Sequence, residues 1–322
     1  MIAEVQKPSS LLTASICYKP FVAPWAVEIA KKHEQSHWIE DEVDLGDDVR
    51  QWNDGTITEI EKQHLVNILR LFTQSDVAVG QNYYEQLIPA FKNNEIRNML
   101  GSFAAREGIH QRAYALLVET LGFPESEFSS FLDYKEASDK INFMMESNTS
   151  SKKGIALTLA KSVFNEGLSL FASFVMLLNY QRFGKMLGTA KIAAWSLADE
   201  TLHVEGNARL FREFLDENPR LVNDEFKTTI YDMGRQIVKL EDKFLDLAYK
   251  MGEPAGLTQK EVSKYIRYMC DRRLIQLGLK GNYKVKENPL PWLGWLSGEK
   301  HESFFETRVS SYDISGLKGN WW

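Results

Sequence analysis

Residues 107–114 read EGIHQRAY, a stretch in which Glu107 comes three residues before His110. The same spacing recurs later in the chain between Glu200 and His203. On an α-helix, side chains three positions apart lie on one face, with their Cβ atoms about 5–6 Å apart. A carboxylate oxygen and an imidazole nitrogen at that separation can bind one metal ion. Both stretches therefore predict metal-binding helices.

Two carboxylates in other apolar helical segments complete the pattern. Asp76 lies in LRLFTQSDVAVGQNYYEQL and Glu166 lies in AKSVFNEGLSLFASF. A lone carboxylate from each of two helices, combined with two Glu-x-x-His pairs, is the arrangement of ferritin-like bundles that hold a dinuclear metal site. The predicted fold class is therefore all-α, with a ferritin-like four-helix bundle core, additional helices and a di-metal carboxylate site.

The expected turns place these carboxylates at matching heights in the bundle. Asp76 and Glu107 are equally far in sequence from a turn expected at Pro89–Asn94, and Glu166 and Glu200 are equally far from a second expected turn. Because an α-helix rises ~1.5 Å per residue, equal counts put the two residues of a helical hairpin at one level. The predicted metal ligands are Asp76, Glu107, His110, Glu166, Glu200 and His203.

A single Glu-x-x-His pair is weak evidence, because four of the six histidines follow a glutamate by three residues. Glu34 and His37 lie in a polar segment and are expected to face solvent. Glu61 fits the N3 position of a capping box opened by Thr58. His64, on the same helix, lies too far along it to share a metal ion with the predicted cluster.

The cost of burial favours a metal cluster over a structural explanation. Burying four carboxylates without cations would cost several kcal/mol each, and no lysine or arginine is placed to neutralise all four. A site of carboxylates with one histidine per metal ion suits iron or manganese better than structural zinc. Such sites activate dioxygen, and several classes of enzyme share them.

Composition limits the other function classes. The 322 residues carry a net charge of −6 with no basic cluster, which argues against nucleic-acid binding. Two cysteines give neither a disulfide framework nor a zinc site. No signal peptide or long uncharged apolar run is recognised, so we expect a cytoplasmic protein without a membrane span.

The chain is expected to fold as one large helical domain. Residues 1–23 are expected to be irregular, residues 24–290 to form the helical domain, and residues 291–322 to form a flexible tail. A first helix is expected to begin at Pro24, a favoured residue for the first helical position. Periodicity predicts further helices at about 58–87, 94–121, 134–147, 152–181, 186–215, 223–251 and 258–277.

Three further residues are considered for roles other than direct metal binding. Tyr114 lies on the inward face of the helix that carries Glu107, although a core tyrosine with a satisfied hydroxyl is an equally good interpretation. Asp199 points away from the metal face and can accept the outer N–H of a ligating histidine. Trp38, taken alone, would be an ordinary core residue.

These features together resemble the small, radical-generating subunit of class I ribonucleotide reductase. Asp76 followed 31 residues later by E-x-x-H-x-x-x-Y resembles the family's first half-site. NEGLSLFASF around Glu166 and D-E-x-L-H from Asp199 resemble its second half-site. The segment W-x-E-x-E-V-D from Trp38 resembles the region of its tryptophan relay, and V-S-S-Y ending at Tyr312 resembles its C-terminal segment. The resemblance covers nearly the whole chain.

The resemblance implies a mechanism and partners. A dinuclear metal centre (two iron ions, two manganese ions or one of each) reacts with an oxygen species, dioxygen or superoxide, the latter with a possible flavoprotein activator. The oxidising equivalent passes through His110, Asp199 and Trp38 to Tyr312, and then to a large subunit that reduces ribonucleotides to deoxyribonucleotides. The small subunit is expected to be a homodimer, with Trp321 and Trp322 anchoring its tail on the large subunit.

The chain departs from the family's usual pattern near Tyr114. Ser196 stands where the family usually has an aliphatic residue, and Ala198 replaces a common arginine beside Asp199. A hydroxyl near Tyr114 can admit water or change its hydrogen bond. Two assignments therefore remain: a radical on Tyr114, or an oxidising equivalent stored on the metal centre while Tyr114 stays reduced.

Two other functions fit a ferritin-like site. The first is another di-metal oxidase, such as a desaturase or a ligand-binding oxidase, which would usually have glutamate as its first ligand and lack the set of Tyr114, Trp38 and Tyr312. The second is an iron-storage or purely structural bundle. Deoxynucleotide formation with a large subunit separates the first, and metal analysis with gel filtration separates the second.

Overall fold

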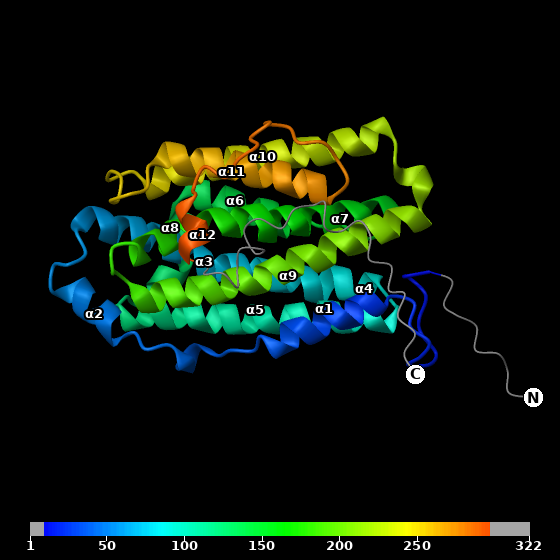
Figure 1. The fold of residues 1–322 in the computed structure, drawn as a ribbon, viewed down its shortest axis with the longest axis horizontal. Coiled ribbons are helices and arrows are strands. Elements are labelled where there is room, and N and C mark those ends of the chain that lie inside the picture. The colour runs from blue at the N-terminus through cyan, green and yellow to red at the C-terminus, as the bar shows by residue number, and fades with distance from the viewer. Residues whose placement is uncertain (1–9, 297–322) are drawn as a thin grey trace, which may run out of the picture.

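The computed structural model describes residues 10–296, and the side chains within 10–294. In this range the chain forms helices and no strands, as the sequence predicted (Figure 1). The long α-helices are α1 (Pro24–Gln35), α3 (Glu59–Asn82), α5 (Asn94–Thr120), α6 (Lys135–Met145), α7 (Lys152–Phe164), α8 (Leu170–Gln181), α9 (Leu187–Glu217), α10 (Asp224–Ala248) and α11 (Gln259–Gln276). The shorter ones are α2 (Gly46–Asn53), α4 (Ile88–Ala90) and α12 (Trp292–Leu296). Short 3₁₀ turns lie at Glu40–Glu42, Glu125–Asp133 and Pro219–Leu221.

Two helical hairpins make up the core of the bundle. In the first, α3 packs along α5, and in the second, α7 and α8 together pack along α9. The hairpins are joined by contacts of α5 with α9 and of α3 with α8, so four long helical segments enclose one apolar interior (Figure 1). Helix α1 covers α5, while α10 and α11 pair and pack against α6, α7 and α8. The ferritin-like core with additional helices is confirmed.

Two of the core helices contain a π-helical turn that the sequence did not predict. Residues Tyr83–Leu87 continue α3 as a π-helix, and residues Asn165–Ser169 join α7 to α8 in the same way. A π-turn widens the helix locally and is frequent at functional sites. Glu166 lies inside the second of these turns, so the turn sets the direction of its side chain.

The start of α9 is held by a helix that was not expected. Helix α2 (Gly46–Asn53) begins within the acidic segment of residues 40–48, and its Asp48 is buried rather than solvated. The Asp48 carboxylate accepts hydrogen bonds from the backbone N–H groups of Gly188 (3.0 Å) and Thr189 (2.7 Å). Free N–H groups and the positive end of the dipole make a helix N-terminus a favourable place for a carboxylate. Asp48 therefore fixes the beginning of the helix that carries Glu200.

The segment Lys152–Gln181 is long and apolar enough to cross a membrane by length and composition alone. Its most apolar part is entirely buried among the other helices. Burial of this kind is the pattern of a core helix in a soluble protein, because each face of the helix meets another apolar face.

The packed part of the chain continues beyond residue 290, where the flexible tail was expected to begin. Trp292 and Leu293 are buried, and the Arg182 guanidinium lies 4.5 Å from the centroid of the Trp292 ring. A contact of this type adds cation–π attraction to the apolar burial. At the other end, the Glu217 carboxylate accepts a hydrogen bond from the Leu11 backbone N–H at 3.0 Å, which fixes part of the irregular N-terminal segment.

Candidate metal centre

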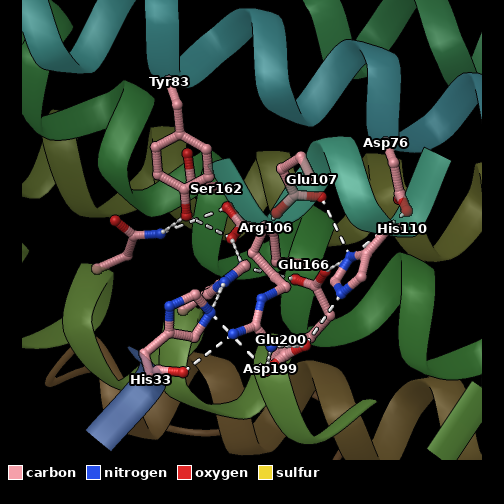
Figure 2. Close-up of polar contacts among 12 residues, drawn as sticks. His33, Asp76, Tyr83, Arg106, Glu107, His110, Ser162, Glu166, Asp199 and Glu200 are labelled. Atoms are coloured by element: carbon pink, nitrogen blue, oxygen red, sulfur yellow. Dashed lines mark hydrogen bonds and ion pairs between the residues drawn. The ribbon is translucent and has the colours of Figure 1, made fainter. Parts of the chain in front are cut away.

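The six predicted ligands meet in the interior of the bundle, and we refer to them as the ligand cluster. All of them are fully buried, with exposed fractions of 0%. They come from α3, α5, the π-turn between α7 and α8, and α9, and Figure 2 shows several of them pointing toward one another. The members are Asp76, Glu107, His110, Glu166, Glu200 and His203.

Two carboxylates lie between the two histidines. Glu107 places Oε2 3.4 Å from His110 Nδ1 and Oε1 3.1 Å from His203 Nδ1. Glu200 likewise places Oε1 3.3 Å from His110 Nδ1 and Oε2 3.3 Å from His203 Nδ1. Asp76 lies beside His110 only, at 3.6 Å, and Glu166 beside His203 only, at 3.4 Å. The arrangement thus offers two shared carboxylates and one terminal carboxylate for each histidine.

The donor atoms of the cluster are better arranged to bind metal ions than to form hydrogen bonds with one another. Both carboxylate oxygens of Asp76, Glu107 and Glu200, and Nδ1 of both histidines, have no hydrogen-bond partner of acceptable geometry although they are buried. Buried polar atoms without partners are rare and costly in native proteins. Oxygen-rich donor sets with imidazole suit iron and manganese. The buried cluster can therefore hold a dinuclear metal centre.

The electrostatics of the cluster also favour cation binding. Burial raises the pKa of Asp76 well above its usual value, and the neighbouring Glu107 raises it further. Burial likewise raises the pKa of Glu166 to about 7. Burial alone would lower the pKa of His203, but Glu200 and the other carboxylates raise it well above its usual value. Without metal ions, protons supply the positive charge that these carboxylates require, and metal binding releases such protons.

On the His110 side, the outer nitrogen faces a carboxylate, as the sequence suggested. His110 Nε2 lies 3.2 Å from Asp199 Oδ2, and Trp38 Nε1 donates a hydrogen bond to the same oxygen at 2.8 Å. The Trp38 ring stacks on the His110 ring with a centroid distance of 5.8 Å. Arg106 Nη1 lies 2.7 Å from both oxygens of Asp199, and Figure 2 shows this pair next to the cluster. Burial raises the pKa of Asp199, yet the His110 hydrogen bond and the nearby cations lower it to about 2.

Sequence reasoning missed Arg106, although it directly precedes Glu107. From α5 it supplies the buried positive charge beside Asp199. The available signal was its position next to a ligand, because adjacent residues on a helix do not share a face and Arg106 must therefore point out of the cluster.

Arg106→Met is expected to lower the free energy of unfolding of the metal-free protein by about 3 kcal/mol, because it leaves a buried carboxylate without its cation. Both partners are nearly inaccessible to water, with side-chain exposures of 4% and 1%. Chemical denaturation monitored by circular dichroism measures the change.

Arg112→Met on the same helix is the matched control for this prediction. Arg112 pairs with Glu40, but its side chain is 57% exposed. Exposed pairs contribute at most about 1 kcal/mol. Equal destabilisation by the two substitutions would show that the buried Arg106–Asp199 pair contributes no more to the free energy of unfolding than an exposed pair.

On the His203 side, the outer nitrogen faces another histidine. His203 Nε2 lies 3.0 Å from His33 Nε2, and His33 Nδ1 lies 2.8 Å from Ser102 Oγ. When His203 Nδ1 serves as a ligand, its proton resides on Nε2 and is donated to His33. His33 must then carry its own proton on Nδ1 and donate it to Ser102. Burial and the nearby His203 lower the pKa of His33 to about 2, so a neutral His33 is the expected form. The two histidines of the cluster therefore have different outer partners.

Tyr114 lies in an apolar pocket beside the His110 side. The side chain is fully buried, and the Phe72 ring meets it edge to face at 4.7 Å between centroids. Phe174 packs in turn on Phe72 at 5.0 Å. Neither the Tyr114 hydroxyl nor the Ser196 hydroxyl has a hydrogen-bond partner of acceptable geometry. Burial raises the pKa of Tyr114 well above its usual value, and the nearby Ser196 hydroxyl acts in the opposite direction.

The other Glu-x-x-His pairs behave as expected. Glu34 and His37 are exposed. Glu61 completes the capping box with Thr58, and His64 Nδ1 lies 2.9 Å from the Tyr180 hydroxyl, away from the cluster. Tyr312 and the two C-terminal tryptophans lie outside the described residues.

A four-helix core with four buried carboxylates and two imidazoles turned toward one another defines a ferritin-like di-metal carboxylate protein. The family model described as "Ribonucleotide reductase, small chain" matches residues 15–289. The chain therefore belongs to the ribonucleotide reductase small-chain family.

Its relatives point the same way. A probable ribonucleoside-diphosphate reductase small subunit of Invertebrate iridescent virus 3 is 38% identical, over 97% of this chain and 88% of its own. The ribonucleoside-diphosphate reductase subunit beta of Chlamydia pneumoniae is 27% identical, over 92% of this chain and 90% of its own. These relatives favour ribonucleotide reductase over a desaturase or a ligand-binding oxidase.

Solved structures share the fold. The ribonucleotide reductase R2 subunit from Clostridium botulinum superposes with a TM-score of 0.79 at 19% identity, covering 87% of this chain and 90% of its own. The dimanganese(II) NrdF of Streptococcus sanguinis superposes with a TM-score of 0.74 at 18% identity, covering 86% of this chain and 96% of its own. As a small subunit of ribonucleotide reductase, the protein acts together with a large subunit in the formation of deoxyribonucleotides.

Proposed function

We propose that the ligand cluster binds two redox-active metal ions and that this chain supplies the oxidising equivalent used by the large subunit. When bound, the ions would supply the one-electron oxidising power that radical formation requires. The observation that carries the proposal is the hydrogen-bonded chain from His110 through Asp199 to Trp38, which begins at a ligand of the cluster. Glu107 and Glu200, which each direct one oxygen toward each histidine, would hold the two ions together with Asp76, Glu166, His110 and His203.

Each residue of the hydrogen-bonded chain from His110 to Trp38 has a defined task. Asp199 accepts hydrogen bonds from both His110 and Trp38 at the same oxygen, Oδ2. When an electron leaves the Trp38 ring, its Nε1 proton can shift toward that oxygen, so the ring avoids a full positive charge. Arg106 holds the Asp199 carboxylate in place and keeps it ionised, ready to accept the proton. The stacked rings of Trp38 and His110 provide the short contact that electron transfer requires.

The proposed path ends at Tyr312, which would pass the equivalent to a cysteine of the large subunit. In the presence of the large subunit and the bound metal ions, Tyr312→Phe is expected to abolish deoxynucleotide formation while leaving metal content unchanged. Phenylalanine keeps the ring but has no hydroxyl to oxidise. Product formation with labelled ribonucleoside diphosphate measures the effect. Full activity of the Tyr312→Phe protein would count against the radical path.

Two assignments for storage of the oxidising equivalent remain, and the Ser196 hydroxyl beside Tyr114 is the reason to test both. Electron paramagnetic resonance of the oxygen-treated protein separates them. A narrow organic signal that disappears in Tyr114→Phe assigns storage to Tyr114. A multiline metal signal that persists in the same variant assigns it to the metal centre.

Iron, manganese or one of each satisfies the ligand types, and the dimanganese(II) form of the Streptococcus sanguinis neighbour supports manganese as one metal that the site can hold. Anomalous diffraction at the iron and manganese edges, on protein from its native host, identifies the metals. Activation by dioxygen or by superoxide with a flavoprotein, a homodimeric assembly, and docking of the tail on the large subunit through Trp321 and Trp322 are part of the same proposal. They follow from membership in the family and from the aromatic character of the chain end.

A further inference from the structure

A second buried tyrosine lies on the opposite side of the cluster from Tyr114. Tyr83 is fully buried at the start of the π-turn that follows α3. Its hydroxyl donates a hydrogen bond to Glu166 Oε2 at 2.5 Å and accepts one from Asn207 Nδ2 at 2.7 Å. Asn207 Nδ2 also lies 3.4 Å from Glu166 Oε1. Figure 2 shows the Tyr83 ring descending onto this network at the edge of the cluster.

The directions of these hydrogen bonds are determined by chemistry. An amide Nδ2 can only donate, so the Tyr83 oxygen must act as acceptor toward Asn207. The single hydroxyl proton of Tyr83 is then directed at Glu166. Both oxygens of Glu166 thus face a donor, whereas both oxygens of Asp76, the corresponding terminal carboxylate on the His110 side, have none of acceptable geometry.

The network also connects Glu166 to the histidine of the same side. Asn207 follows His203 by four residues on α9, so the two side chains lie on one face of that helix. Glu166 Oε2 lies 3.4 Å from His203 Nδ1. Tyr83 and Glu166 both lie in π-turns, and these two turns bring side chains from different hairpins into contact.

We propose that Tyr83, supported by Asn207, is a positioning residue for the ion on the His203 side. Tyr83 keeps one oxygen of Glu166 hydrogen-bonded, so Glu166 presents its carboxylate to that ion in a single orientation. The two halves of the centre therefore differ: the His110 side is organised by Asp199 through its histidine, and the His203 side by Tyr83 through its carboxylate. This inference rests on the metal-binding role of the ligand cluster proposed above.

The proposal is tested by titrating the metal-free full chain with Mn(II) and monitoring the titration by calorimetry and electron paramagnetic resonance. Tyr83→Phe is expected to weaken one of the two binding events about 10- to 100-fold, the usual effect of losing an outer partner of a ligand. The other binding event stays unchanged. At subsaturating Mn(II), the resonance spectrum of the variant should show more isolated Mn(II) and less coupled pair than the parent protein.

Tyr180→Phe is the matched control, because it removes an equally buried tyrosine hydroxyl whose hydrogen-bond partners are His64 Nδ1 and the Glu61 backbone carbonyl rather than a carboxylate of the cluster. Both Mn(II) affinities are expected to remain those of the parent protein. Asn207→Leu removes the supporting donor and is expected to weaken the same binding event as Tyr83→Phe, but less. Thermal unfolding of the metal-free variants separates this effect from general destabilisation.

The outcomes distinguish failure of the proposed metal centre from failure of the proposed role of Tyr83. If the parent protein binds no Mn(II) or iron, the proposed metal centre is wrong. If the parent protein binds two ions and folded Tyr83→Phe binds both with unchanged affinity, only the role of Tyr83 is overturned. If Tyr83→Phe does not fold, the decision passes to Asn207→Leu, and unchanged affinities in that variant overturn the role.

Discussion

A protein carrying Glu107→Ala is expected to lose both metal ions, with deoxynucleotide formation in the presence of the large subunit falling by more than about 100-fold. Glu107 directs one oxygen toward each histidine, at 3.4 Å and 3.1 Å, so its removal affects both ions. Loss of an outer partner already weakens metal binding by about 10- to 100-fold, and loss of a shared ligand should exceed that. Metal content by elemental analysis and product formation measure the two effects.

A double substitution elsewhere is the control for Glu107→Ala. Glu34→Ala with His37→Ala removes a pair of identical spacing that is exposed to solvent. It should leave metal content and activity unchanged. If folded Glu107→Ala retains two ions, Glu107 is not a required ligand of either ion. If it loses only one ion, Glu107 is a ligand of that ion alone.

The second large effect is expected for Trp38→Phe, which should lower deoxynucleotide formation by about 100-fold or more, equal to about 2.7 kcal/mol of barrier. Phenylalanine keeps an aromatic ring near His110, but it is harder to oxidise and has no N–H to share with Asp199 Oδ2. The ligand cluster is untouched, so metal content should stay at two ions per chain. Activity with the large subunit and metal analysis on the same sample separate the two quantities.

Trp195→Phe is the matched control for this prediction. The Trp195 ring contacts the Trp38 ring at 5.2 Å between centroids, but of these two tryptophans it is Trp38 that donates a hydrogen bond to Asp199. Its replacement should change activity little. Normal turnover by Trp38→Phe, with a full metal content, would show that the oxidising equivalent leaves the centre by a different route.

Much of the fold was predictable because its signals are local. The helix beginning at Glu59 has its capping box in four consecutive residues, and Pro24 marks the first turn of α1. Helix α2 was missed because its acidic composition suggests solvent, and only the N-terminus of α9, far away in sequence, explains why its Asp48 is buried.

The ligand cluster could be predicted for a related reason. Asp76 and Glu107 face each other because a helical hairpin converts sequence distance from its turn into height, and sequence alone gives that distance. The same count cannot give rotation about the helix axis. The π-turns at Tyr83–Leu87 and Asn165–Ser169 change that rotation, and no local residue pattern predicted them.

The sequence by itself determined the all-helical class and the six candidate ligands, because each depends on spacing along one helix or one hairpin. The placement of Asp199 and Trp38 beside His110 was implied only by the family resemblance, since the three residues come from different segments of the fold. Only the tertiary structure decided that Glu107 and Glu200 each face both histidines, that Arg106 neutralises Asp199, and that His33 and Tyr83 complete the His203 side. Those contacts join helices from different hairpins, and their geometry depends on how the hairpins pack and rotate against each other, which spacing within a helix does not record.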